Sequence, residues 1–392
     1  MQRIAVTPRP DWQQRVESIG FAHHTSDDGS PYWNESACYL FTSAEIDTIQ
    51  AATLELNRLC LEAIEHILRH SLWDEFQIPP LYRPWIRRSW DEETISIVGR
   101  FDLLYDGVNP PKLAEYNADT PTALIEAALA QWFWLQDVSP ESDQFNSLHE
   151  KLIDAWREMK REVGTPVTFA AVQNHLEDFA TVTYLRDVAE QAGIETQYLA
   201  MHSIGWNDRQ QTFVDLRDNP LPCVFKLYPW EWMMREEFGK RLPTNSTRWL
   251  EPPWKVLLSN KAILPLLWKL YPDHPNLLPA SFELMSGRSV RKPTQGREGA
   301  NIAILDDGGV TESTGGEYTD EPVIYQQFMP LPRFDGQTAI LGSWMVNGEA
   351  CGMGVREDAG TITTNLSRFV PHRMISDETG IVAVNTSVVV AQ

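Results

Sequence analysis

From residue 99 to residue 122 the chain reads Gly99-Arg-Phe-Asp-Leu-Leu-Tyr-Asp-Gly-Val-Asn-Pro-Pro-Lys-Leu-Ala-Glu-Tyr-Asn-Ala-Asp-Thr-Pro-Thr122. The apolar and aromatic segment 101–105 predicts a strand, and the dense turn residues at 107–111 predict a reversal. The segment 112–116 then predicts a second strand. The stretch is therefore expected to form a β-hairpin that leads into a helix.

This hairpin would bring two carboxylates face to face. Strand side chains alternate between faces, so a turn centred at 108–109 places Asp102 opposite Glu115 and Arg100 opposite Asn117. Facing carboxylates repel each other, and an oxygen-ligated cation such as Mg²⁺ would remove that penalty. The alternative is a solvated face on which Arg100 neutralises the acids. Spacing alone leaves both interpretations open.

Length and composition predict a globular chain of two or three packed lobes. It has 392 residues, of which 43% are hydrophobic and 22% are charged. The net charge of −21 argues against a nucleic-acid partner, because phosphate binding requires basic surface. The same charge fits a cationic or metal-chelated substrate, and it also fits plain solubility.

The cysteines and the apolar runs bear on the compartment. Cys38, Cys60, Cys223 and Cys351 are scattered without paired spacing, so we expect neither a disulfide framework nor a zinc site. Residues 1–12 do not resemble a signal peptide, and no apolar run reaches the length that a bilayer requires. A cytoplasmic protein with no membrane partner is expected.

Two helix starts are predicted in the first part of the chain. The segment 42–45 is a capping box that begins a long scaffold helix ending near His70. Thr120 can cap a second helix with Pro121 at its first position, and that helix would offer backbone donors to an anion. Thr120 and Thr122 are therefore either ordinary capping residues or contacts to a substrate carboxylate.

Residues in the middle of the chain predict a βαβ unit. A strand at 167–172, a helix at 179–192 and a strand at 195–200 suggest a small open α/β lobe. Glu177 and Lys226 lie near strand ends of this lobe. From the sequence alone, surface charges are the favoured interpretation of both residues.

The last third of the chain carries features typical of phosphate binding. Lys261 opens an amphipathic helix, and a strand at 290–293 is followed by the loop 295–299, in which glycines bracket an arginine. Such a loop can cover phosphates because glycine lets backbone N–H groups approach oxygen closely. It is neither a Walker A loop nor a dinucleotide fingerprint.

Two further β segments follow this loop. The strand at 323–329 ends at Pro330 and has the character of an edge that hydrogen-bonds an adenine. A hairpin turning at Asn347-Gly348 delivers Arg356 at a strand end, shortly before residues 361–363.

Taken together, these motifs resemble the glutathionylspermidine synthase family, and most closely its short stand-alone bacterial members, the acid–amine ligases. The resemblance covers nearly the whole chain. It rests on Gly-Arg-Phe-Asp, Glu-Tyr-Asn-Ala-Asp-Thr-Pro-Thr, Ser-Asn-Lys-Ala-Ile-Leu-Pro, Val-Arg-Lys-Pro, Gly-Arg-Glu-Gly and Gly-Met-Gly-Val-Arg-Glu-Asp, in this order.

The resemblance implies an ATP-grasp fold with an additional small open α/β lobe. The lobes would be an N-terminal helical part with the metal-binding hairpin (1–164), a pre-ATP-grasp-like lobe (165–250) and the nucleotide-binding lobes (251–392). It also implies a ligase that joins a carboxylate to an amine through an acyl phosphate, with ATP and two Mg²⁺ ions.

The resemblance further assigns roles to individual residues. The metal ligands would be Asp102, Glu115 and Asn117. Phosphoryl and acyl-phosphate charge would be stabilised by Arg100, Arg297 and Arg356. ATP would contact Arg100, Asp102, Lys261, Lys292, Gly299, Gln326, Thr361, Ile362 and Thr363. The acid substrate would contact Thr120, Thr122, Glu177 and Lys226.

The chain also departs from the better-known members. They carry an N-terminal amidase with a catalytic cysteine, whereas this chain begins at the synthetase part and is not expected to hydrolyse the conjugate. Thr120 and Thr122 stand where those members have serines, so a glutathione-like peptide and a polyamine are candidate substrates only. A decayed nucleotide-binding protein and an ATP-independent metal hydrolase are the alternatives. Nothing in the sequence indicates an oligomeric state.

Overall fold

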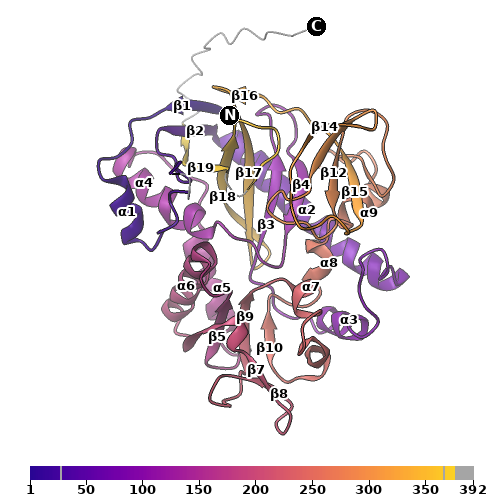
Figure 1. The fold of residues 1–392 in the computed structure, drawn as a ribbon. Helices are drawn as coiled ribbons and strands as arrows, with labels where there is room; N and C mark the ends of the chain where they lie inside the picture. The colour runs from indigo at the N-terminus through magenta and orange to yellow at the C-terminus, as the bar shows by residue number, and fades with distance from the viewer. Residues whose placement is uncertain (27–28, 365–366, 376–392) are drawn as a thin grey trace.

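The computed structural model describes residues 1–26, 29–364 and 367–375. In these residues the chain has a mixed α/β fold (Figure 1). Two antiparallel sheets lie side by side in the upper half of the view, and a parallel sheet flanked by helices forms the lower half. The candidate functional residues come from all three sheets.

The predicted hairpin belongs to a six-stranded antiparallel sheet. Its order is β19-β18-β17-β3-β4, with β16 paired to β17. The strands are β3 (Val98–Leu104), β4 (Lys112–Asn117), β16 (Arg333–Phe334), β17 (Gln337–Val346), β18 (Glu349–Asp358) and β19 (Arg368–Val370). The register pairs Asp102 with Glu115 and Arg100 with Asn117, which confirms the prediction. The hairpin at 98–117 therefore shares one sheet with strands from the C-terminal third.

The second antiparallel sheet is built wholly from the last third of the chain. Its order is β11-β15-β12-β13-β14. The strands are β11 (Ala280–Ser281), β12 (Ser289–Pro293), β13 (Ala303–Asp306), β14 (Gly309–Ser313) and β15 (Val323–Gln327). The predicted strands at 290–293 and 323–329 are confirmed. The helix expected to start at Asn260 is α9 (Ile263–Leu270), which begins later than predicted because Asn260 is extended; a separate short helix, α8 (Lys255–Ser259), precedes it.

The four-stranded sheet is parallel and confirms the predicted βαβ unit. Its order is β10-β9-β5-β6, and α6 connects β5 to β6. The elements of this region are α5 (Leu148–Met159), β5 (Val167–Ala171), α6 (Leu176–Gln191), β6 (Thr196–Ala200), η2 (Met201–Ser203), β7 (Gly205–Asn207), β8 (Thr212–Val214), β9 (Cys223–Leu227), α7 (Trp230–Met233), η3 (Gly239–Thr244) and β10 (Arg248–Leu250). The carboxyl ends of β5 and β9 point toward the six-stranded sheet (Figure 1).

The N-terminal part begins at the top of the view in Figure 1, with β1 (Gln2–Ala5) and β2 (Ala37–Thr42), and ends at α3 (Arg83–Asp91) in the lower half. Its other elements are α1 (Trp12–Ser18) and α2 (Ser43–His70), and β2 pairs in parallel with β20 (His372–Ile375). The capping box of α2 is confirmed, because the Thr42 hydroxyl accepts from the Glu45 backbone N–H at 3.2 Å. The helix packs against β17 and β18 and so supports the back of the hairpin sheet.

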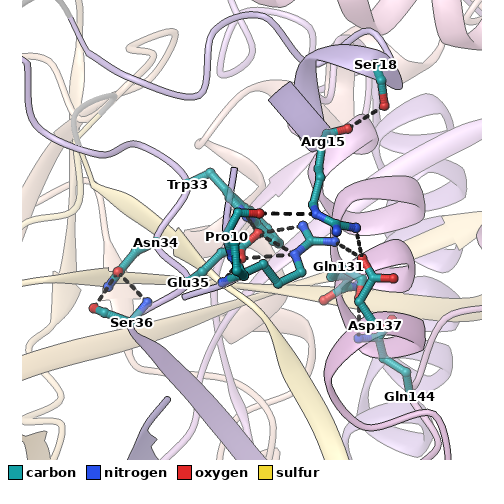
Figure 2. A network of polar contacts seen from close by, with 11 residues as sticks. Pro10, Arg15, Ser18, Trp33, Asn34, Glu35, Ser36, Gln131, Asp137 and Gln144 are labelled. Carbon is teal, nitrogen blue, oxygen red and sulfur yellow. Dashed lines mark hydrogen bonds and ion pairs between the residues drawn. The ribbon is translucent and has the colours of Figure 1, made fainter. Parts of the chain in front are cut away.

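A buried ion pair fixes the segment between α1 and β2. Arg9 donates to Glu35 at 2.6 Å and to Asp137 of α4 (Gln131–Val138) at 2.7 Å, and the indole N–H of Trp33 donates to Glu35 at 2.9 Å. Figure 2 shows Arg15 reaching the same Asp137 carboxylate. The N-terminal segment is thereby attached to the helix that follows the hairpin.

The helix after the hairpin does not begin where the sequence predicts. Helical residues start at Leu124 rather than at Pro121, because Ala123 takes a left-handed conformation with φ of 68°. The helix runs through a π-helical turn, η1 (Glu126–Ala130), into α4 (Gln131–Val138). The predicted capping role of Thr120 is therefore wrong.

Three apolar clusters form the core, and the largest unites α2, the hairpin sheet and α9. Cys38, Cys60, Cys223 and Cys351 are buried and free. Within the described ranges, no helix is both long enough and apolar enough to cross a bilayer.

The buried His372 predicts a pH dependence of stability. One ring nitrogen, Nδ1, hydrogen-bonds Gln131 Oε1 at 2.8 Å, and Nε2 is buried without a partner among the described residues. Burial lowers the pKa of His372 to about 3 from its ordinary 6.5. The unfolded chain therefore binds an extra proton between pH 6.5 and 3, so the stability present above pH 6.5 is lost as the pH falls through this window.

We expect a loss of about 1.4 kcal/mol per pH unit from this residue. Urea unfolding of the wild type and of His372→Asn between pH 7 and 4 measures it. Asparagine can still donate to Gln131 but does not titrate, so the variant should show the shallower pH profile. Parallel profiles would contradict the prediction.

Candidate active site

Two cavities meet at the predicted hairpin. The larger one, of about 360 Å³, lies between the two antiparallel sheets. The smaller one, of about 170 Å³, lies between the hairpin and the carboxyl ends of β5 and β9. Residues that line both cavities are Arg100, Asp102, Glu115, Gly299, Arg356 and Thr363. A reactive group could therefore be shared between a molecule in one cavity and a molecule in the other.

Arg100 is buried at this junction and is held in a fixed orientation. Its Nε and Nη2 donate to the two oxygens of Asp102 at 2.7 and 3.1 Å, and its Nη1 donates to the carbonyl of Thr122 at 2.6 Å. A Cβ atom at position 342 would lie 2.9 Å from Arg100 Cδ, so Gly342 on β17 leaves room for this side chain. The bidentate geometry presents a fixed positive charge at the junction.

Glu115 is joined to two lysines from the C-terminal third. Lys261 Nζ lies 3.1 Å from its Oε2 and also donates to the carbonyl of Gly296 at 2.6 Å. Lys292 Nζ donates to the carbonyl of Ala114 at 2.9 Å and to Gln326 Oε1 at 2.8 Å. Two lysines that are distant in sequence from the hairpin therefore converge on it.

Burial and neighbouring charges shift the pKa values of Asp102, Glu115 and Lys292 in different directions. Burial raises the pKa of Asp102, and the neighbouring Arg100 only partly offsets this effect. Burial also disfavours the charged form of Glu115, but Lys261 and Lys292 outweigh it and lower the pKa to about 2. Burial lowers the pKa of Lys292 to about 8. Glu115 is therefore a carboxylate throughout the physiological pH range.

The hairpin offers donors that fit Mg²⁺. The Asn117 amide contacts both acids, with Nδ2 at 3.1 Å from Asp102 Oδ2 and at 3.4 Å from Glu115 Oε1. Rotating this amide by half a turn would direct its oxygen to the same place. Within the described ranges, no group of three His, Cys, Asp or Glu side chains could hold a metal. An ion here would therefore need oxygens from a substrate as well, which is usual for Mg²⁺ on phosphates.

The glycine-bracketed loop closes over the junction. Arg297 donates to Glu231 Oε1 at 2.7 Å and to the Thr120 hydroxyl at 2.8 Å. Gly299 has φ of 71°, and a Cβ atom there would lie 2.4 Å from the carbonyl oxygen of Thr363. Only glycine fits this approach. The loop thereby lies against the segment 361–363, which lines the larger cavity.

Arg356 on β18 faces both cavities. Its Nη2 donates to the carbonyl of Thr364 at 2.7 Å, and its guanidinium lies 5.3 Å from the ring centre of Phe369. Its Nε is buried without a hydrogen-bond partner in the described part of the chain. Arg356 therefore has a donor available for a negatively charged group.

Most of the predicted site residues lie in these cavities. Those that line the larger cavity are Arg100, Asp102, Glu115, Lys292, Gly299, Gln326, Arg356, Thr361, Ile362 and Thr363. Those that line the smaller cavity include Asn117, Thr120, Thr122 and Arg297. Lys261 lines neither but contacts Glu115.

Two predicted substrate contacts lie outside both linings. Lys226 is completely buried and donates to Asp119 at 2.5 Å, so its ammonium group is already paired with a carboxylate inside the protein. Glu177 is half-buried beside Thr122. Burial, together with the nearby Glu126, raises the pKa of Glu177, and its hydrogen bond to Thr122 acts in the opposite direction.

Sequence reasoning missed Asp119 and Glu231, which hold Lys226 and Arg297. Asp119 belongs to the motif that follows the hairpin, but its partner is 107 residues away, and no local pattern links the two. It also missed the apolar residues Val172, Tyr228 and Trp232 on the far side of the smaller cavity.

Comparisons with known proteins show the family to which this chain belongs. The model of the family "Glutathionylspermidine synthase preATP-grasp" matches residues 3–375. A Haemophilus influenzae protein provisionally named an acid–amine ligase is 43% identical over 96% of this chain and 100% of its own length. Trypanothione synthetase of Crithidia fasciculata is 30% identical over 76% of this chain, which spans 50% of that protein.

One solved structure is similar over almost the whole chain. It is a glutathione synthetase-like effector from Globodera pallida in its apo form, with a TM-score of 0.57 and 10% sequence identity. The match covers 93% of this chain and 96% of the other. At this identity the similarity bears on the fold alone, and it shows a mixed α/β fold of the glutathione synthetase-like kind.

Proposed function

Because this chain belongs to the glutathionylspermidine synthase family and is an ATP-dependent amide-forming ligase of that family, we propose that it joins the carboxylate of a peptide-like acid to an amine through an acyl phosphate. The observation that carries the proposal is the junction of two cavities at Arg100, Asp102, Glu115 and Arg356. ATP would occupy the larger cavity and the acid the smaller one.

The proposed fold is an ATP-grasp fold, with ATP between the two antiparallel sheets. The strands of 251–392 and the hairpin would form the nucleotide-binding part, and 165–250 would be the pre-ATP-grasp-like lobe. Within the larger cavity, polar side chains gather near the hairpin, while Leu278, Val290 and Ile340 provide apolar surface for a base. Lys292 would contact the phosphates, with Lys261 beside it.

Asp102, Glu115 and Asn117 would hold Mg²⁺, with two ions proposed. Bound Mg²⁺ would neutralise negative charge on the nucleotide phosphates. The chain's own contribution is positional: the Asp102 carboxylate orients Arg100, and the close approach of Gly299 to Thr363 holds the loop beside the junction. Such electrostatic preorganisation is the main means of catalysing phosphoryl transfer.

The reaction that these residues would promote has two steps. In the first, an oxygen of the acid's carboxylate attacks the terminal phosphorus of ATP, an acyl phosphate forms and ADP leaves. Arg100 and Arg356 lie where they can bind the oxygens that carry charge during this transfer. In the second, the amine attacks the acyl carbon, phosphate leaves and the ammonium proton is lost. Neither step requires a nucleophilic side chain.

Thr120 and Thr122 are proposed to contact the acid. Both line the smaller cavity, and the Thr120 hydroxyl is already oriented by Arg297. Candidate partners are a glutathione-like peptide as the acid and a polyamine as the amine. Lys226 is not part of this proposed contact set, because its side chain is completely buried.

The test is an assay of ADP release in a panel of acids and amines. We expect release only when MgATP, an acid and an amine are all present, with a new product whose mass is that of the two substrates minus water. Independently, MgADP at 100 times its dissociation constant should stabilise the fold by about 2.7 kcal/mol. Stabilisation without turnover across the panel would indicate a binding protein, and absence of stabilisation would contradict nucleotide binding.

A further inference from the structure

The smaller cavity has two sides of different chemistry. One side carries the hairpin with Arg100, Asp102 and Glu115. The opposite side is formed by Val172 after β5 and by the segment that follows β9. We call this second side the apolar wall, and its residues are Val172, Leu227, Tyr228, Pro229 and Trp232.

The apolar wall is accessible, because Val172 and Trp232 are each 36% exposed. Large apolar side chains that gather around one opening usually mark a binding surface. The ring of Trp232 packs edge-on against Tyr228 with centres 5.4 Å apart, so the wall is preorganised.

Arg297 lies beside the apolar wall, with its guanidinium 5.9 Å from the ring centre of Trp232, but it is already paired with Glu231 and so is not free for a second carboxylate. Among the described residues that line this cavity, the cations are Arg100, Arg297 and Arg356. Arg100 is paired with Asp102 and Arg297 with Glu231, and Arg356 lies at the junction. Lys226, the nearest cation behind the wall, donates to Asp119.

An acidic side chain at the same cavity strengthens this restriction. Asp178 and Glu298 both line it; Asp178 is paired with His175 at 3.1 Å, which leaves Glu298 to repel a further negative charge. The Tyr228 hydroxyl already donates to Glu236 at 2.5 Å. A ligand would therefore contact the aromatic ring of Tyr228 rather than its hydroxyl. A charged group placed against such a surface would lose its hydration without gaining a partner.

We propose that the acid substrate of this ligase is a peptide-like monocarboxylate with an aromatic or bulky aliphatic side chain that lies on the apolar wall. The inference rests on the proposed function and narrows its substrate class. The carboxylate lies at the junction, and the apolar group packs on Trp232 and Val172. Among the candidate acids named above, a glutathione-like peptide carries a second carboxylate, and we therefore expect it to bind more weakly than a monocarboxylate with an apolar side chain.

The experiment measures binding separately from turnover. N-acetyl-Phe-Gly, N-acetyl-Glu-Gly and N-acetyl-Gly-Gly are titrated calorimetrically into the protein with MgADP, and the same acids are tested for ADP release with MgATP and amines. We expect the Phe peptide to bind at least about tenfold more tightly than the Glu peptide. Trp232→Ala should weaken the Phe peptide about tenfold and leave the Gly peptide unchanged.

Trp132→Ala is the matched control, because Trp132 is 40% exposed on α4 and lines neither cavity. The Trp132→Ala variant should change the affinity for neither the Phe peptide nor the Gly peptide. The inference is overturned if the Glu peptide binds as tightly as the Phe peptide or more tightly. It is also overturned if Trp232→Ala weakens the binding of the Phe and Gly peptides equally. Trp232→Phe, which keeps an aromatic ring, should restore Phe-peptide binding if the alanine variant folds poorly. Tight binding of the Phe peptide without ADP release would support this inference and count against the ligase reaction.

Discussion

Asp102→Asn is expected to reduce ADP release at least about a thousandfold while the protein stays folded. The carboxylate acts twice in the proposed site, since it orients Arg100 through two hydrogen bonds and would be a ligand of Mg²⁺. Asparagine keeps the size and one acceptor but removes the charge. Steady-state ADP release as a function of Mg²⁺ concentration measures the effect, with circular dichroism to verify the fold.

Asp154→Asn is the control for this prediction, because Asp154 lies exposed on α5 and contacts only the nearby Arg157 among the described residues. It should leave ADP release unchanged. An Asp102→Asn variant with full activity would remove Asp102 from the metal site. Activity recovered at high Mg²⁺ would instead identify weakened metal binding as the main loss.

Lys226→Met is expected to destabilise the fold by about 3–5 kcal/mol, because it leaves Asp119 buried and without its ionic partner. Lys226 is completely buried, and Asp119 also accepts from the Trp230 backbone N–H at 2.9 Å. The pair connects β9 to the segment that carries Thr120 and Thr122. Urea unfolding measures the stability, and the same preparation measures KM for the acid.

The double variant Lys226→Met/Asp119→Asn should recover part of the loss, since no charge then stays buried alone. Lys151→Met is the control, because Lys151 forms an exposed ion pair with Glu349 and its removal should change stability little. The alternative is a direct contact between Lys226 and the substrate. That alternative predicts a raised KM with unchanged stability, and this outcome would contradict the positioning role.

The hairpin could be predicted because local chemistry determines it. The turn residues at 107–111 fix where the chain reverses, and the two-residue alternation then fixes which side chains face each other. The observed ladder also contains a β-bulge between Asp102 and Leu103, which shifts the pairing by one residue so that Asp102 lies opposite Glu115. The hairpin at Asn347-Gly348 was predictable for the same reason, and both of its turn residues have positive φ.

The start of the next helix could not be predicted, because tertiary contacts decide it. Thr120-Pro121 has the chemistry of a helix start. However, Arg297 donates a hydrogen bond to the Thr120 hydroxyl, and Arg100 donates one to the Thr122 carbonyl. Ala123 then takes a left-handed conformation that no sequence rule assigns to alanine. The local preference is overridden by two arginines, of which one lies far away in sequence.

The pairing of buried charges was also beyond sequence reasoning. Lys226 ends a strand of the parallel sheet, where a cation is usually solvated, and only the three-dimensional path of the chain places Asp119 beside it. The same holds for Arg297 with Glu231. The sequence could place polar side chains on one strand or in one loop, whereas it could not predict which buried charges pair across the fold.

The sheet that holds Asp102 has a consequence for how the protein is made. β3 ends at Leu104, but its neighbour β17 begins only at Gln337, so the sheet closes a very long loop. Such non-local pairing forms late in folding. During synthesis, the ribosome must therefore release most of the chain before Arg100 and Asp102 meet their supporting strands. A ligand of this site can therefore stabilise the protein only after the C-terminal third has been synthesised, because β17 and β18 complete the sheet.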